Sequence, residues 1–102
     1  MDSIIVFNII HGNFAVTTDD GNNIFAMVDE YLEKKEKVIL DFKGISIVTT
    51  AFLNAAIGQL YHKFSSEDIS PYLILNNVDD EDLILFKKVT NRAKQYFAQK
   101  ES

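Results

Sequence analysis

Two adjacent threonines, Thr49 and Thr50, are the residues of this sequence best placed for regulatory chemistry. They follow a short apolar run and precede a periodic apolar stretch, the position in which hydroxyl groups cap the first N–H groups of a helix. Two roles are open for such a hydroxyl. It caps the helix and does nothing more, or it also carries a phosphoryl group or helps to hold an anion. Asp41 ends the apolar run, where parallel strands place ligands. Its simpler role is to accept backbone N–H bonds in the turn before Gly44.

Other residues with catalytic potential form no recognisable pattern. His11 and His62 stand at no spacing that argues for a triad, and the absence of cysteine excludes disulfides, thiolate metal sites and cysteine nucleophiles. The acidic run from Asp79 to Asp82 offers hard oxygen ligands, but it lacks the glycine and the spacing of a calcium loop. Carboxylates also favour helix starts for electrostatic reasons. We therefore expect no enzyme activity, no metal and no cofactor.

Composition limits the remaining classes of protein. The 102 residues are 47% hydrophobic, which leaves room for a single domain, residues 1–102, with a substantial core. The net charge of −5 disfavours nucleic acid, and the basic residues near the C-terminus, Lys87, Lys88, Arg92 and Lys94, are interpreted as a solvated helix face. The N-terminal apolar stretch is too short for a signal or membrane segment. These features predict a cytoplasmic protein that binds neither nucleic acid nor membranes.

Apolar periodicity and turn residues predict the elements that position the threonines. We expect strands at Ile4–Ile10, Phe14–Val16, Lys37–Phe42 and Tyr72–Leu75. The His11-Gly12-Asn13 turn signal joins the first two strands as a hairpin. We expect helices from Thr17 or Thr18 to about Leu32, from about Thr50 to Phe64, and from the acidic run to Phe97, with a polar loop at Ser65–Ser70.

The order of these elements predicts an α/β fold. Strand–helix–strand units imply parallel pairing with right-handed crossovers. We therefore expect a mixed, mostly parallel four-stranded sheet with an N-terminal hairpin and about three helices. Its centre should contain the residues Val38–Leu40, Ile57, Leu60 and Leu73–Leu75.

Five residues carry a resemblance to a known family: Asp41, Phe42, Gly44, Ile45 and Phe52. They match an Asp-Phe-x-Gly-(Ile/Val) turn and the phenylalanine after a Thr/Ser-rich helix start. In this the chain resembles STAS domains, the fold of bacterial anti-sigma-factor antagonists, and more closely the STAS-like domain family of unknown function. The segment from Gly12 to Phe25 is also similar to the family's first hairpin and the start of its first helix. The resemblance implies a STAS-like fold and a bacterial, non-catalytic regulatory module that docks on a kinase-like ATPase or another regulatory partner.

The helix start departs from the antagonist pattern Asp-Ser-Ser/Thr-Gly. Residue by residue, the Asp falls on Thr49, the first Ser on Thr50, the phosphoacceptor on Ala51 and the Gly on Phe52. Ala51 has no hydroxyl, but the adjacent Thr50 can substitute for it. The resemblance places partner recognition around these residues and Asn54. Phe52 either contributes an exposed apolar contact or packs inward on the sheet.

Two alternatives concern partners. The helix N-terminus at Thr50 can instead sense a small ligand, an anion or a nucleotide, through its free N–H groups. The last turns of the C-terminal helix carry Tyr96 and Phe97, whose apolar surface either packs back or is covered by a partner or by a second copy in a homodimer.

Overall fold

Three parallel strands form the main sheet of the protein. The computed structural model describes the backbone of residues 1–100 and the side chains up to Tyr96. The strands are β1 (Asp2–Ile5), β3 (Val38–Asp41) and β5 (Leu73–Asn76), in the order β1-β3-β5. The register aligns Ile4, Leu40 and Leu75 across the sheet, so their side chains form one apolar row on the same face.

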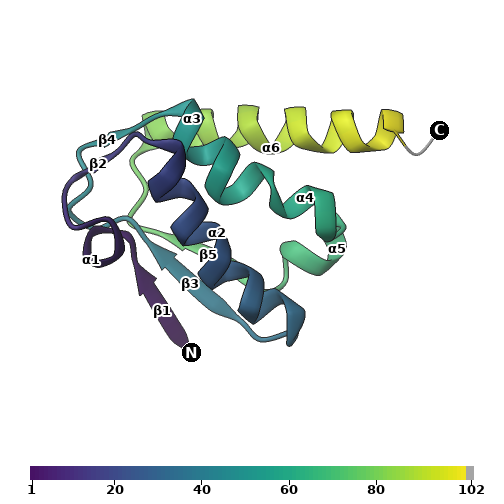
Figure 1. Ribbon diagram of the computed structural model, residues 1–102, viewed down its shortest axis with the longest axis horizontal. Coiled ribbons are helices and arrows are strands. Elements are labelled where there is room, and N and C mark those ends of the chain that lie inside the picture. Colours follow the sequence, from purple (N-terminus) through teal and green to yellow (C-terminus); the bar gives the residue numbers. More distant parts are fainter. Residues whose placement is uncertain (101–102) are drawn as a thin grey trace.

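A second, smaller sheet consists of β2 (Phe14–Ala15) and β4 (Ile47–Val48), which also pair in parallel. It lies at the end of the molecule where the segments after β1 and β3 come side by side (Figure 1). The pairing brings the residues just before the Thr49-Thr50 helix start next to the residues just before α2 (Thr18–Glu33).

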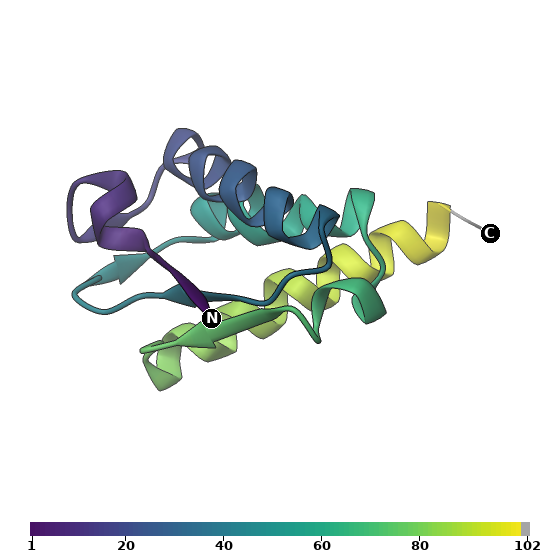
Figure 2. The same cartoon turned by 90° about the horizontal axis from the view of Figure 1, so that it is seen from below.

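The helical segments pack against the inner face of the main sheet. The other helical elements are α1 (Val6–Ile10), α3 (Thr50–Leu53), the π-helix η1 (Asn54–Gly58), α4 (Leu60–Lys63), α5 (Ser66–Ile69) and α6 (Asp80–Lys100). The segments α2 and α3–α4 lie side by side, and α6 runs along the side of α3–α4 that faces away from α2 (Figure 1). Seen from below, α6 lies along β5 and extends past the end of the sheet (Figure 2).

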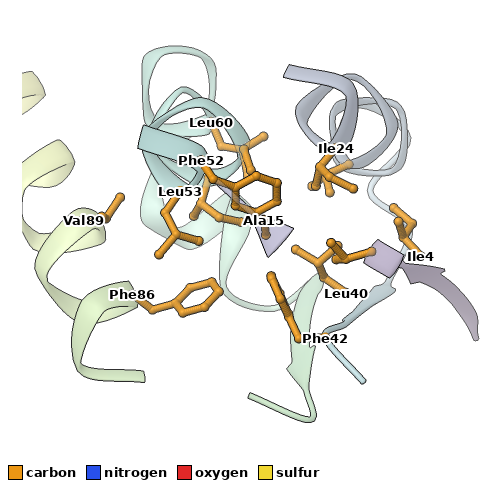
Figure 3. Close-up of a cluster of buried hydrophobic side chains, with 14 of the residues drawn as sticks. Ile4, Ala15, Ile24, Leu40, Phe42, Phe52, Leu53, Leu60, Phe86 and Val89 are labelled. Atoms are coloured by element: carbon orange, nitrogen blue, oxygen red, sulfur yellow. The ribbon is translucent and has the colours of Figure 1, made fainter. Parts of the chain in front are cut away.

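The core lies between the strands and the helices (Figure 3). Val38 and Leu40 of β3 are fully buried, as are Leu60 of α4 and, almost completely, Ile57 of η1, which confirms their expected central positions. Leu73 and Leu75 of β5 are only half-buried, so the expectation that Leu73–Leu75 lie at the centre of the fold is wrong. The outer face of the main sheet carries exposed apolar side chains: Ile5 is 40% exposed and Ile74 is 37% exposed.

The expected hairpin and four-stranded sheet are wrong. The chain pairs as strand β1 only to Ile5 and then forms α1, which places Val6, Ile9 and Ile10 on one helical face against α2. The helix ends at His11, whose φ of 59° is left-handed and whose backbone N–H donates to the Phe7 carbonyl. Because α1 separates β1 from β2, these strands form no hairpin and enter different sheets, each with a parallel partner.

Two further segments differ from the sequence-based expectations. The Ser65–Ser70 loop contains the short helix α5, capped by Ser65 and anchored by buried Ile69. Ile47 and Val48, for which no strand was predicted, form β4. Both elements are too short to produce a periodic apolar signal.

The helix expected from Thr50 to Phe64 is present but contains a π-helical turn. The backbone N–H of Gln59 donates to the carbonyl of Asn54, five residues back, at 3.0 Å. Such a turn widens a helix locally and occurs often at functional sites. In the described part of the chain, no helix is both long and apolar enough to cross a membrane.

Candidate functional site

Thr49 fixes the start of α3 to the small sheet. Its backbone N–H donates to the Ala15 carbonyl at 3.1 Å, and its Oγ1 donates to the Val16 carbonyl at 2.9 Å. The same Oγ1 accepts the backbone N–H of Phe52 at 3.3 Å, so Thr49 is the N-cap of the helix. The hydroxyl therefore acts within the fold, holding the helix start in a defined orientation.

Phe52 packs inward and is fully buried. The hypothesis that it provides an exposed contact is wrong, because its apolar ring gains more from burial than from solvent. Its ring meets Phe42 edge-on at a centroid distance of 6.5 Å, and Phe42 meets Phe86 of α6 edge-on at 5.3 Å. This row of aromatic rings holds α6 against the end of β3 and the start of α3.

The remaining helix-start residues lie on the surface. Thr50, Ala51 and Asn54 are exposed. Thr50 and Asn54, one helical turn apart, line a cavity of about 50 Å³ together with α6 residues that include Lys88 and Arg92. The sequence interpretation had assigned these two cations to a solvated helix face. Their spacing of four residues indicates a shared face, but only tertiary packing places that face opposite Thr50.

Asp41 serves the turn after β3 rather than the helix start. Its Oδ1 accepts the backbone N–H of Lys43 at 2.9 Å and the side-chain amide of Asn77 at 2.8 Å. These two bonds, the Asn77 bond being the stronger cause, lower the pKa of the carboxyl below its usual value. Asp41 does not line the cavity of Thr50 and Asn54, so the structure assigns it the simpler of its two expected roles.

The lowered pKa of Asp41 makes one contribution to stability depend on pH. A carboxyl with a depressed folded-state pKa stabilises the fold above its unfolded pKa of about 3.9, and this contribution disappears as the pH falls through the folded pKa. We expect Asp41→Asn to lower the melting temperature at neutral pH and the gap to wild type to shrink toward pH ~3. Thermal melts across this range measure the gap, and a constant gap would contradict the assignment.

The acidic run lies at the start of α6. Asp80, Glu81 and Asp82 occupy the first helical turn, and the Asp79 carbonyl accepts the N–H of Leu83 at 2.9 Å. Partial burial, followed by the charges of Asp79 and Glu81, raises the pKa of Asp82. Within the described residues, no group of three or more metal-binding side chains is arranged to hold an ion. The run therefore sits where carboxylates complement the helix dipole.

This parallel sheet with its helices, which supports the capped and surface-facing start of α3, is a STAS-like α/β fold. The family model described as "STAS-like domain of unknown function (DUF4325)" matches residues 20–83, and the chain belongs to this family. No curated protein and no solved structure gives a significant match. The matched segment contains Asp41, Thr50 and Asn54, whereas Lys88 and Arg92 lie beyond it.

Proposed function

We propose that this protein is a non-catalytic regulatory module that binds a protein partner through the exposed start of α3. The observation that carries the proposal is that some residues of this helix start stabilise the fold while their neighbours are exposed to solvent. Thr49 and Phe52 are committed to the fold, while Thr50, Ala51 and Asn54 remain on the surface. A contact surface held rigidly from below loses little conformational entropy on binding. Membership in a STAS-like family fits a regulatory or interaction module.

The proposed partner is a kinase-like ATPase, such as an anti-sigma factor, or another regulatory protein. Ala51 occupies the position of the usual phosphoacceptor and has no hydroxyl, so phosphoryl transfer to that residue does not control this module. Thr50 is the exposed hydroxyl nearest to it along the chain. A phosphate on Thr50 would face Lys88 and Arg92 across the shared cavity, which supports Thr50 as the place of any relocated switch.

The proposal is tested by placing two bulky side chains on the contact surface. We expect Thr50→Arg combined with Asn54→Arg to weaken binding of the partner, isolated by pull-down from the native host, by roughly tenfold or more. The fold should survive because both side chains are exposed. Thermal melts check the fold, and titration calorimetry measures the affinity.

A matched control is available in the first turn of α2. Thr18 directly follows the N-cap Thr17, as Thr50 directly follows Thr49. Thr18→Arg combined with Asn91→Arg adds the same charge at exposed positions that line no part of the cavity. This control should bind normally. Unchanged affinity in the folded Thr50→Arg/Asn54→Arg variant would show that the interface lies elsewhere.

The next surface to examine would be the C-terminal part of α6. Tyr96 is 53% exposed there. The side chain of Phe97, the other residue expected to offer apolar surface, lies outside the described residues. A contact at this end, with a partner or a second copy of the chain, is the alternative interface.

A small-ligand sensor is the second candidate function. Lys88 and Arg92 beside Thr50 favour it, because two cations at a helix start attract an anion or a nucleotide. Co-purification of a nucleotide with the native protein, without a stoichiometric protein partner, would support this candidate over the first.

A further inference from the structure

The cavity at Thr50 is one end of a longer groove between two helical stripes. A second cavity of about 270 Å³ shares Asn54, Val89 and Arg92 with the first, so the two adjoin. One wall is a stripe of α6 at helical spacing: Leu85, Lys88, Val89, Arg92, Ala93 and Tyr96. The other wall follows the opposite helix at intervals of four residues: Thr50, Asn54, Gly58 and His62.

Gly58, in the π-helical turn, opens the floor of this groove. A Cβ atom built at Gly58 would lie 3.7 Å from Cγ1 of Val89 and 3.7 Å from Oδ1 of Asn54. These are ordinary contact distances, so a methyl group would fit there without displacing its neighbours. The neighbouring Gln59 side chain is drawn toward α2, where it donates to Asn22 Oδ1 at 2.7 Å. The centre of the groove is therefore shallow and largely apolar, with Gly58 and Val89 buried at its floor and Ala93 half-buried beside them.

The charge along the groove is positive in an otherwise acidic protein. The chain has 15 acidic residues and a net charge of −5, yet no Asp or Glu within residues 1–96 lines either cavity. Among the residues that the structure describes, the ion pairs involve Lys63 with Asp29 and Glu33, and neither Lys88 nor Arg92 takes part in one. Two cations on one wall with no carboxylate opposite them attract negative charge.

The length of the groove suits a short piece of extended chain. From Leu85 to Tyr96 the α6 wall rises by about 16 Å at 1.5 Å per residue. An extended segment advances about 3.3 Å per residue, so roughly five residues span it. A lone inorganic anion would meet the cations but leave the apolar floor at Gly58, Val89 and Ala93 uncovered.

We propose that this groove binds an extended acidic segment of the partner protein. Carboxylates of the segment pair with Lys88 and Arg92, and a small apolar side chain between them covers Gly58 and Val89. The inference rests on the proposed function, since the groove continues the contact surface at Thr50 and Asn54. It adds the chemistry of the partner's contacting segment.

A peptide titration followed by NMR tests the chemistry directly. The isotope-labelled protein is titrated with the synthetic peptide Glu-Leu-Glu-Ala-Glu and, separately, with Lys-Leu-Lys-Ala-Lys. We expect saturable shifts of the Gly58, Val89 and Arg92 amides with the acidic peptide only, weakened by added salt. No saturable shift at millimolar peptide, or equal shifts with the basic peptide, would overturn the proposal. So would inorganic phosphate producing the same shifts at the same concentration, because the occupant would then be a small anion.

Charge reversal separates this inference from the proposed function. Lys88→Glu combined with Arg92→Glu should weaken partner binding by about tenfold or more. The control, Lys87→Glu combined with Lys94→Glu, makes the same charge change on the same helix at residues that do not line the groove, and it should bind normally. If the reversed protein fails to fold, Lys88→Gln combined with Arg92→Gln takes its place with a smaller expected loss.

The combined outcomes are distinguishable. If Thr50→Arg/Asn54→Arg abolishes binding while the folded Lys88→Glu/Arg92→Glu protein binds normally, the proposed function stands and the acidic-segment inference falls. If both folded variants bind normally, both proposals fall.

Discussion

Replacing Gly21 by alanine is expected to destabilise the protein by about 1–3 kcal/mol, although the same change inside most helices is stabilising by up to ~1 kcal/mol. The reason is the close approach of α2 to the α3–η1 segment. A Cβ at Gly21 would lie 2.5 Å from the carbonyl oxygen of Phe52 and 2.7 Å from the Cβ of Ala55. The first of these atoms belongs to the backbone, so a whole helix has to move. Urea unfolding measures the free energy.

Gly58→Ala is the matched control for this prediction. Gly58 is also a buried glycine on a helical segment, but its added methyl group would meet its nearest neighbours at 3.7 Å. We expect Gly58→Ala to be neutral or stabilising by up to ~1 kcal/mol. Equal changes in unfolding free energy for the two variants would show that α2 does not approach the helix start this closely. That contact orients the α3 start, so the result also bears on the proposed surface.

Leu40→Ala is expected to cost about 2–5 kcal/mol, the range for truncating a buried leucine. Leu40 is fully buried in the central strand β3, with Ile4 and Leu75 beside it in the same row of the sheet. Removing its side chain loses transfer free energy and leaves a cavity between strands and helices that the surrounding elements cannot fill. Chemical denaturation of the variant and the wild type gives the difference in unfolding free energy.

The adjacent residue provides a control within the same strand. Ile39 points to the outer face of the sheet and is only half-buried. Ile39→Ala removes a side chain of the same volume class but should cost clearly less than Leu40→Ala. An equal or larger loss would mean that the outer face is covered as well as the inner one.

Local patterns in the sequence determined much of this fold. The apolar stripe of α2, the buried strand β3, the capping hydroxyls at Thr17 and Thr49 and the long helix α6 were all predictable. Each depends on side chains within one or two turns or on one short run, so periodicity and capping chemistry carry the information. The family was also predictable, because its turn and helix-start residues lie in one continuous stretch.

Tertiary structure decided the remaining features. Val6–Ile10 is rich in β-branched residues, yet it is helical because that conformation packs its apolar face against α2. A strand was expected at Phe14–Val16, where β2 lies, but its partner β4 is 33 residues away in register and no local pattern predicts it or the parallel pairing. The sequence did not determine whether Phe52 points outward or inward, because its burial depends on the packing of the helix against Phe42.

The candidate site divides in the same way. Thr49, Thr50 and Asn54 could be selected from the sequence because they belong to one helix start. Lys88 and Arg92 could not be assigned to that site, since they lie more than thirty residues away and face it only after the Phe42–Phe86 contact docks α6. A groove between two helices is a property of their packing, and the charge inside it follows from which faces meet.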